Sequence, residues 1–355
     1  MIVRVILLFP FTFFYWLATS ARNKFFYWGW RTSRSFPIRI IGIGNLSMGG
    51  AGKSPMVEYI VRLLSSKNNM TILSRGYKRK TKGFAEASVT SLSDEVGDEP
   101  KQFKKKFPEI TVAVCEDRCT GIEEITGRHK ETEVIILDDA YQHRKVKAGL
   151  NILLTDYHKL FTRDYIFPSG TLRESREGAK RADVIVVTKC PLNLCEEEKN
   201  AINNEITLYI KHNTVFFSFL KYTGIKSLHD GRLLADFKKH NKALLFTGIA
   251  DPSPLKKHLE EIFKEIYFIR FSDHHEYSSG DLVRIQETFN NIAEENKIII
   301  TTEKDAMRLE KPEPAEIIKH LPVFIAHIEI DFFPADKITF NQILMEYAEH
   351  DRKNS

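Results

Sequence analysis

The chain has 355 residues, of which 43 % are hydrophobic and 28 % charged, a composition typical of a folded protein with room for two domains. It excludes a disordered chain and a polytopic membrane protein. The net charge of +5 is unevenly distributed along the chain. Residues 1–55 carry seven Lys or Arg and no Asp or Glu, so the remaining residues have a net charge of −2. We therefore expect one basic surface near the N-terminus and no general binding of nucleic acid.

The four cysteines give no sign of a metal site. They show C-x3-C and C-x4-C spacings, without a histidine in zinc spacing. Reduced thiols, as in a cytosolic protein, are expected.

The first expected element is the uncharged stretch from Val5 to Ala18, followed by an aromatic cluster at residues 25–30. Fourteen residues of helix reach only about 21 Å, short of the roughly 30 Å hydrocarbon core, and Pro10 interrupts them. A full span requires the segment to extend through Ser20. Aromatic residues mixed with Arg and Lys are typical of a helix that lies in the membrane interface. We expect residues 1–35 to associate with a membrane surface; a core helix and a cleaved secretory signal are the alternatives.

After this segment, short apolar runs alternate with polar stretches that are compatible with helices. Uninterrupted Val, Ile and Leu runs predict strands buried on both faces, and hence a parallel sheet covered by helices. A first series comprises residues 38–44, 70–74, 111–115, 133–138, 150–156 and 183–188; a second comprises residues 214–219, 242–248, 266–271, 297–302 and 322–330. We predict an α/β fold with a core domain over residues 36–215 and a smaller α/β domain over residues 216–355.

The predicted strand at residues 38–44 leads into the glycine-rich sequence NLSMGGAGKSP and then into a stretch compatible with a helix. This order is typical of a phosphate-binding loop, in which backbone N–H groups curve around phosphate oxygens. Lys53 is expected to face the β- and γ-phosphates, and the Ser54 hydroxyl to face Mg²⁺. The strict G-x4-G-K-[ST] pattern is not met, because Ser47 stands at its first position. The residues expected to contact the nucleotide are Ser47, Met48, Gly49, Gly50, Ala51, Gly52, Lys53, Ser54 and Pro55.

An acidic partner for this loop is expected at the end of another buried strand, and the sequence EVIILDDAYQH provides one. Asp138 follows the apolar run, where it can hold Mg²⁺ directly or through water. Asp139 points elsewhere in an extended chain, so the two carboxylates are expected to have different roles. The alternative for Asp138 is a residue that caps the next helix.

Two classes of nucleotide switch lack their signatures here. A guanine-specific switch normally shows N-K-x-D after a late strand, whereas the sequence VVTKCP has Pro191 in place of the Asp. A dimeric ATPase of the partitioning type has a signature lysine before the paired glycines, and that position is Met48. A kinase that acts on a separate acceptor is therefore favoured.

Most of the chain carries further motifs in one order: GNLSMGGAGKSP, LSRGYKRKTKG, DEVGDEP, DDAYQHR, PSGTLRE, LFTGIADP, FSDHHEY and TTEKDAMRL. Together with the hydrophobic N-terminus, they resemble the tetraacyldisaccharide 4'-kinase family. The resemblance implies a P-loop NTPase-like core domain, a smaller α/β domain, ATP and Mg²⁺, and a lipid substrate reached from the cytosolic side of a membrane. Ala140 and Tyr141 depart from the expected Gly and Phe, which affects the packing near Asp139.

Phosphoryl transfer to a sugar hydroxyl needs a group that accepts the hydroxyl proton and positive charge on the transferring phosphoryl group. By resemblance, Asp98 is the base and His274 of the second domain is its partner, with His275 as the alternative. Closure of the two domains would complete that pair. The expected catalytic residues are Lys53, Asp98, Asp139, Arg173 and His274, and the expected metal ligands are Ser54, Glu99 and Asp138.

Several of these assignments have a purely structural alternative. DEVGDEP alone is typical of a solvated acidic turn, and Arg173 can form a surface ion pair with Glu174 or Glu177. The role of residues 302–305 stays open. The basic residues of the SRGYKRKTKG loop either bind phosphate or lipid headgroups or are solvated; they are Arg75, Lys78, Arg79, Lys80 and Lys82.

The resemblance implies a kinase that transfers the γ-phosphate of ATP to the 4'-hydroxyl of a tetraacyldisaccharide 1-phosphate in lipid A biosynthesis. We expect a monomer at the cytoplasmic face of the bacterial inner membrane, since an anchored enzyme stays near a substrate held in the bilayer. The alternatives are a membrane-associated P-loop ATPase or nucleotide switch, and a P-loop kinase of a soluble sugar.

Overall fold

The computed structural model describes residues 2–210, 214–234, 241–293 and 295–349. The strands are β1 (Arg39–Asn45), β2 (Met70–Ser74), β3 (Ala85–Glu86), β4 (Thr111–Val114), β5 (Val134–Leu137), β6 (Leu150–Asp156), β7 (Val184–Thr188), β8 (Val215–Ser227), β9 (Lys242–Thr247), β10 (Glu265–Arg270), β11 (Lys297–Thr302) and β12 (Val323–Phe332). Within the described ranges they form one 12-stranded sheet in the order β10-β9-β11-β12-β8-β7-β6-β1-β5-β2-β4-β3. The pairings are parallel except for β3 with β4 and β8 with β12.

The helices are α1 (Ile2–Tyr27), α2 (Lys53–Leu64), α3 (Ser93–Val96), α4 (Asp98–Lys106), α5 (Arg118–Arg128), α6 (Glu196–Thr207), α7 (Ser253–Glu260), α8 (Ser279–Asn290), α9 (Glu303–Leu309), α10 (Pro312–Ile318) and α11 (Pro334–Glu349), with 3₁₀ turns η1 (Phe161–Arg163) and η2 (Arg176–Arg181). The α/β class and the mostly parallel sheet predicted from the sequence are therefore confirmed. Each predicted apolar run overlaps a strand, although β8 extends eight residues beyond its run, and the two-residue β3 was not predicted.

The first part of the sheet, β7-β6-β1-β5-β2-β4, is buried on both faces because successive side chains of a strand point to opposite sides. Ile41 and Ile43 of β1 pack in one cluster with α2 and α4. Ile40, on the opposite face, packs with Ile122 and Ile125 of α5. The carboxyl ends of these parallel strands lie at one edge of the sheet, where ligands bind in open α/β folds.

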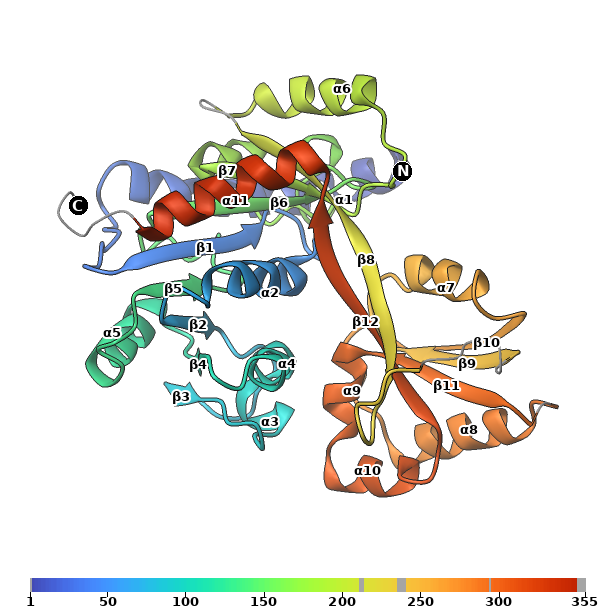
Figure 1. Cartoon of the computed structure of the whole chain (residues 1–355). Coiled ribbons are helices and arrows are strands. Elements are labelled where there is room, and N and C mark those ends of the chain that lie inside the picture. Colours follow the sequence, from blue (N-terminus) through green and yellow to red (C-terminus); the bar gives the residue numbers. More distant parts are fainter. Residues whose placement is uncertain (1, 211–213, 235–240, 294, 350–355) are drawn as a thin grey trace.

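The second part of the sheet, β10-β9-β11 with half of β12, has its own two-sided core. Leu244 and Phe246 of β9 pack against α8, and Ala243 and Leu245 pack against α7. Figure 1 shows the two parts joined by the long strands β8 and β12, which run from one into the other.

The division of the chain at residue 215 stays a prediction. β8 begins at Val215 and extends across both parts. After β12, the chain returns to the first part, where Phe340 and Leu344 of α11 pack in the same cluster as α2 and β1. The first core is thus built from two separate stretches of the chain.

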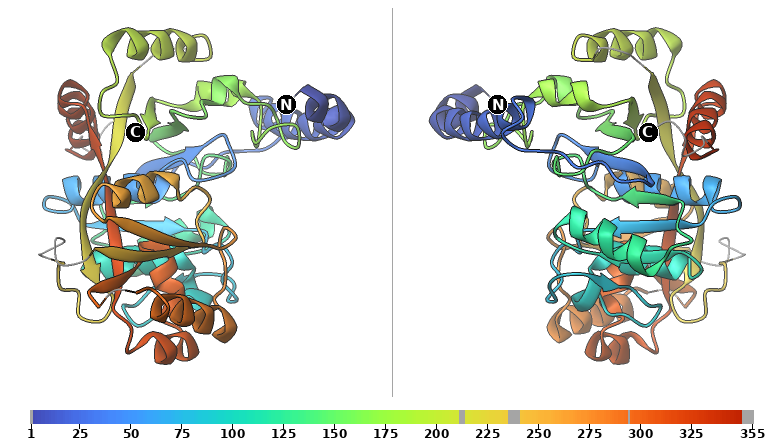
Figure 2. Two further views of the ribbon diagram at one scale, coloured as in Figure 1. Left: turned by 90° about the vertical axis from the view of Figure 1, so that its right-hand side faces the viewer. Right: turned by 90° about the vertical axis from the view of Figure 1, so that its left-hand side faces the viewer.

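The N-terminal helix α1 projects from one side of the first part, as Figure 2 shows. The interruption expected at Pro10 is not found: α1 continues through this residue. Proline lacks a backbone N–H, so the helix loses one hydrogen bond there without ending. None of the helices in the described part of the chain is both long enough and apolar enough to cross a membrane. Large apolar side chains on α1 are nevertheless exposed, among them Phe11 at 66 % and Phe14 at 67 %.

Candidate active site

The glycine-rich loop lies between the end of β1 and the start of α2, as a phosphate-binding loop requires. Gly49 (φ 111°) and Gly52 (φ 80°) adopt left-handed backbone conformations, which glycine accepts without steric cost. Lys53 is the first residue of α2, and the buried Ser54 follows it. The free N–H groups and positive dipole end of α2 therefore face the loop, which makes the loop a cradle for an anion.

Hydrogen bonds to the backbone of the cradle hold it from two sides. The Met48 N–H donates to the Thr171 carbonyl at 2.7 Å, and the Thr188 hydroxyl donates to the Ala51 carbonyl at 3.0 Å. The Lys53 ammonium donates to Asn45 Oδ1 at 3.2 Å and lies 3.5 Å from Asp139 Oδ1. Lys53 is thus held beside the loop by Asn45 and Asp139.

Asp138 and Asp139 follow β5 and differ sharply in environment. Asp138 is buried and accepts a hydrogen bond from Ser74 at 3.0 Å. Burial, with the charges of Asp139 and Glu99 nearby, raises the pKa of its carboxyl to about 6. Asp139 has a left-handed backbone (φ 47°). Burial disfavours its charge, but Lys53 and Arg173 outweigh burial and lower the pKa of Asp139.

Arg173 lies in the segment after β6 and faces Asp139 rather than its sequence neighbours. Its guanidinium NH1 donates to Asp139 Oδ1 at 3.2 Å and to Gln142 Oε1 at 3.3 Å. Glu174 instead pairs with Arg181 at 2.8 Å, and Glu177 pairs with Lys180. Lys53, Asp139 and Arg173 therefore form one connected group beside the cradle.

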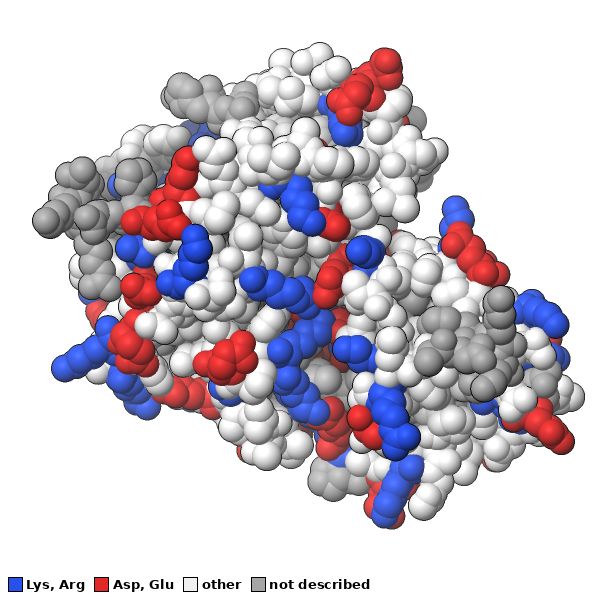
Figure 3. Space-filling view, in the orientation of Figure 1, with Lys and Arg blue, Asp and Glu red and all other residues white. Residues whose placement is uncertain are grey.

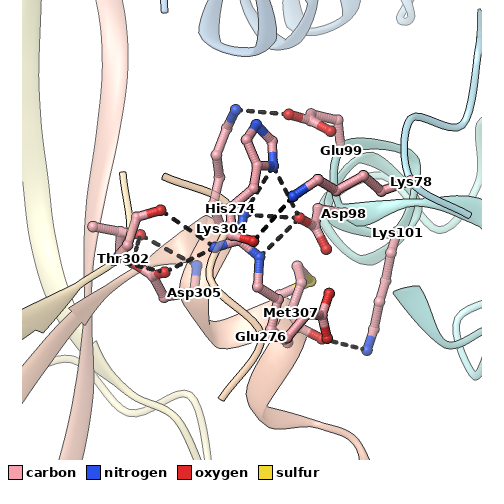
Figure 4. Close-up of polar contacts among 12 residues, drawn as sticks. Lys78, Asp98, Glu99, Lys101, His274, Glu276, Thr302, Lys304, Asp305 and Met307 are labelled. Carbon is pink, nitrogen blue, oxygen red and sulfur yellow. Dashed lines mark hydrogen bonds and ion pairs between the residues drawn. The ribbon is translucent and has the colours of Figure 1, made fainter. Parts of the chain in front are cut away.

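Asp98 occupies the first turn of α4 and meets residues of the second part of the molecule. Arg308 of α9, itself 1 % exposed, donates to Asp98 Oδ2 from Nε at 2.8 Å, and its Nη2 lies 2.8 Å from the same oxygen. His274 Nδ1 lies 3.6 Å from the same oxygen and 3.3 Å from Arg308 Nη2. Burial disfavours the Asp98 charge, but His274 and Arg308 together lower the pKa of Asp98. Figure 4 shows this meeting of α4 with His274 and α9.

The two adjacent histidines, His274 and His275, face different parts of the molecule. His275 Nε2 pairs with Asp281 at 2.9 Å and stacks on Phe271, so it faces its own part of the molecule. His274 has a left-handed backbone (φ 56°), a conformation rare outside glycine that is found at constrained functional positions. Of the two, His274 is the one that turns toward Asp98.

Glu99, next to Asp98, pairs with Lys304 of α9 at 2.7 Å. Burial opposes ionisation of Glu99, but the Lys304 ammonium overcomes it and lowers the pKa of Glu99 to about 2. Glu99 in turn raises the pKa of Asp138, which puts the two carboxylates within electrostatic reach of each other. The charges of the expected metal ligands Glu99 and Asp138 therefore act on each other, and their joint binding of a metal stays a prediction.

The block at residues 302–305 connects the second part to α4. Asp305 is fully buried and accepts hydrogen bonds from Thr247, Tyr277 and Arg308. It thereby fixes Arg308 against Asp98. Neither Lys304 nor Arg308 was predicted as a site residue from the sequence. Their i, i+4 spacing, on a helix that directly follows a buried strand, is the one sequence feature that could have indicated that both point to the same side.

The basic loop after β2 also reaches the second part. Lys78 donates to the His274 carbonyl at 3.3 Å, while Arg79 pairs with Glu116 at 2.6 Å and Lys80 with Asp94 at 2.6 Å. On the face seen in Figure 3, Lys and Arg side chains gather along the junction of the two parts. The junction is therefore rich in positive charge beside the acidic residues of α4.

Tyr141, where the family pattern led us to expect Phe, is buried with its hydroxyl hydrogen-bonded. Its ring is buried under the Arg181 guanidinium, and its hydroxyl donates to the Gly178 carbonyl at 2.8 Å. A Cβ on Gly44 would come within 2.6 Å of the Tyr141 Cβ, so the close approach of β1 to this residue requires glycine.

Comparisons with known proteins agree over nearly the whole chain. The family model described as tetraacyldisaccharide-1-P 4'-kinase matches residues 4–348. A tetraacyldisaccharide 4'-kinase of Bacteroides fragilis is 41 % identical over 356 residues (98 % of this chain, 94 % of the relative), and one of Flavobacterium johnsoniae is 44 % identical over 324 residues (90 % and 93 %). A crystal structure of LpxK from Aquifex aeolicus in complex with ATP superimposes with a TM-score of 0.76 at 29 % identity, covering 97 % of this chain and 99 % of that one.

Proposed function

This chain belongs to the tetraacyldisaccharide-1-P 4'-kinase family, and we propose the following account of the reaction it performs. It is an ATP-dependent phosphotransferase of lipid A biosynthesis that acts on the 4'-hydroxyl of a tetraacyldisaccharide 1-phosphate.

The observation that carries the proposal is the presence of two groups of polar side chains, one beside the cradle and one at the junction of the two parts. One group, Lys53, Asp139 and Arg173, lies beside the cradle. The other, Asp98 with His274 and Arg308, joins α4 to the second part. Phosphoryl transfer needs both a cationic phosphate site and a proton acceptor, and a nucleotide switch needs only the first.

Lys53 and Arg173 supply positive charge to the phosphates in this account. Both cations lie against Asp139, at 3.5 Å and 3.2 Å. This arrangement keeps them oriented without deep burial, so that phosphate oxygens can take over part of their coordination. Asp139 then acts by orienting the two cations.

Asp98 accepts the proton of the attacking 4'-hydroxyl. A base must be ionised and able to approach the substrate, and the Asp98 side chain is 14 % exposed with a lowered pKa. Arg308 fixes one carboxylate oxygen, and His274 Nδ1, 3.6 Å from that oxygen, would come within hydrogen-bond distance if the two parts closed on the substrates.

The residues present fit a magnesium ion. Asp138 is a buried carboxylate whose charge is poorly compensated, as its raised pKa indicates, and Glu99 lies within its electrostatic reach. Among the described residues no group of three or more His, Cys, Asp and Glu gathers around one point, but Mg²⁺ bound with a nucleotide usually takes only one or two carboxylates, and phosphates and water supply the rest. We assign Asp138, Glu99 and Ser54 to this ion, which would neutralise charge on the β- and γ-phosphates.

The exposed apolar face of α1 supports association with the cytoplasmic face of the bacterial inner membrane, where ATP and the lipid substrate meet. Leu7, Phe9, Phe11 and Phe14 are exposed at 60 % or more. An exposed aromatic and aliphatic surface next to basic residues is typical of an interfacial helix. We propose that a monomer binds there without a membrane span.

The test is a label-transfer assay. Purified protein in detergent micelles is incubated with γ-labelled ATP, Mg²⁺ and tetraacyldisaccharide 1-phosphate, and the products are separated by thin-layer chromatography. Label should enter the lipid, and Lys53→Ala should abolish this transfer. The exposed Lys67→Ala serves as the matched control and should behave like the wild type. Label found only in inorganic phosphate would contradict the kinase function and favour the ATPase alternative.

A further inference from the structure

Helix α1 has an inward polar face as well as an exposed apolar one. Thr12, Tyr15, Thr19 and Asn23 are half-buried, whereas Phe13, Phe14 and Trp16 between them are exposed. Spacings of three and four residues place the four inward residues on one side of the helix. The two faces therefore meet different surroundings, and the polar one packs on the protein.

The inward face is bonded to one segment of the core, residues 164–174, here called the Arg173 segment. The Thr12 hydroxyl lies 2.6 Å from the Ser169 hydroxyl, and the Tyr15 hydroxyl donates to the Arg173 carbonyl at 3.1 Å. Asn23 Nδ2 donates to Glu174 Oε2 at 2.8 Å. These contacts span about three turns of α1, so the segment is held along its length.

On its other side, the Arg173 segment is part of the phosphate site. The Arg173 N–H donates to the Leu46 carbonyl, and the Thr171 carbonyl accepts from the Met48 N–H, both at 2.7 Å. The Arg173 side chain reaches Asp139. A single short segment thus connects α1 to the start of the cradle and to the catalytic arginine.

A second connection runs through Glu174, which is fully buried. Besides Asn23, its carboxylate accepts from Arg181 at 2.8 Å and from Gln142 at 3.3 Å. Gln142 Oε1 accepts in turn from Arg173 at 3.3 Å. Without Asn23 this buried carboxylate would lose one of its donors, and the Gln142 contact with Arg173 would be free to shift.

The Arg173 segment is internally bonded and can therefore respond as a unit. Leu172 donates to the Tyr165 carbonyl at 2.9 Å, and Phe167 donates to the Leu172 carbonyl at 3.0 Å. Asp164 accepts from the Thr171 N–H and from its hydroxyl. A shift of α1 would therefore move the Arg173 segment as a whole, and Arg173 with it.

We infer that α1 is a positioning element of the phosphoryl-transfer site: through Tyr15 and Asn23, its inward face holds the Arg173 segment so that Arg173 and the cradle are correctly placed. The inference rests on the proposed function, because Arg173 acts on a phosphoryl group only if the cradle binds the nucleotide. The same helix that meets the lipid surface would then also set the geometry of the reaction.

Tyr15→Phe is the most selective test, because it removes the hydroxyl and leaves the ring against Phe167, 5.5 Å between centroids. With substrate in detergent micelles, kcat should fall about three- to tenfold, as expected for one lost hydrogen bond, with KM for ATP changed much less. Tyr27→Phe is the matched control, since it makes the same change at a side chain that is 74 % exposed, and it should leave kcat unaltered.

A double-mutant cycle separates positioning of Arg173 from general loosening. In an Arg173→Ala background the side chain to be positioned is gone and only the backbone link to the cradle remains, so Tyr15→Phe should lower the residual kcat by a clearly smaller factor than in the wild type. The same fold loss in both backgrounds would overturn the inference, as would an unchanged kcat in the Arg173-containing protein.

Hydrogen exchange supplies a readout that does not depend on the reaction. Tyr15→Phe and Asn23→Ala should each speed amide exchange in residues 164–174 several-fold relative to Tyr27→Phe, without changing exchange in α2. If wild-type protein failed to label the lipid, the proposed function would fail while this coupling could still be measured. Unchanged exchange in residues 164–174 with normal wild-type labelling would refute the coupling alone.

Discussion

Replacing Asp138 by Asn should stabilise the metal-free protein. Burial, with the charges of Asp139 and Glu99, raises the pKa of Asp138 from 3.8 to about 6. An acid whose pKa is higher in the folded than in the unfolded chain costs folding free energy when it is ionised. The two pKa values differ by about 2.2, which at about 1.36 kcal/mol for each tenfold change corresponds to about 3 kcal/mol.

The sign of this effect sets its pH dependence. Below pH 3.8 the carboxyl is protonated in both states and costs nothing; the cost grows as the pH rises and is complete above about pH 6. The Asn amide oxygen can still accept the hydrogen bond from Ser74. Asp138→Asn should therefore raise the free energy of unfolding by up to about 3 kcal/mol at pH 7.5, and by less than about 1 kcal/mol at pH 4.

Urea unfolding in the presence of EDTA, followed by far-UV circular dichroism at both pH values, measures this difference. Asp139→Asn is the control with the opposite expectation, because its charge is stabilised by Lys53 and Arg173, and its loss should destabilise the protein. Mg²⁺ with ATP should stabilise the wild type more than Asp138→Asn. An Asp138→Asn protein that is equally or less stable than the wild type at pH 7.5 would refute the reasoning.

The remaining predictions concern the junction and the membrane helix. Asp98→Asn should lower kcat about 100- to 10,000-fold and leave the Kd for ATP, measured by calorimetry, within about twofold; substantial activity would remove Asp98 as the base. Arg308→Lys should lower both kcat and the thermal midpoint, because an ammonium cannot bridge Asp98 and Asp305 as the guanidinium does, and an unchanged kcat would show that the bridge does not serve the reaction. Replacing Phe11 and Phe14 by Ser should weaken binding to anionic vesicles at least about tenfold in a flotation assay with no change in ATP affinity, whereas undiminished binding would exclude this face of α1 as the lipid contact.

Features that depend on local pattern could be predicted from the sequence. Apolar runs buried on both faces located the strands, and a glycine-rich loop between a strand and a helix located the cradle, because both signals are contained in short stretches of chain. The same logic places the two aspartates after β5 at the edge where the cradle lies. It does not say which of them meets Lys53: we expected Asp138 as the acidic partner of the loop, whereas the ion pair with Lys53 is made by Asp139.

Features that depend on packing between distant stretches could not be predicted. Arg308 reaches Asp98 across 210 positions, and its burial is decided by how β8 and β12 set the two parts against each other. The return of α11 to the first core has the same origin. The inward polar face of α1 could not be predicted for another reason. The composition of residues 1–30 shows only their apolar character, whereas the contacts of Tyr15 and Asn23 depend on a segment 151 to 158 positions later in the chain.

The most direct test of the central claim is the position of the transferred phosphate. Lipid product labelled from γ-labelled ATP is treated with mild acid, which releases a phosphate on the anomeric carbon but leaves a phosphate ester on an ordinary sugar hydroxyl. We expect the label to stay on the disaccharide at the 4'-position. Asp98→Asn protein should label the lipid at least about 100-fold more slowly while still binding ATP. Label released by mild acid, or present only as inorganic phosphate, would contradict the central claim.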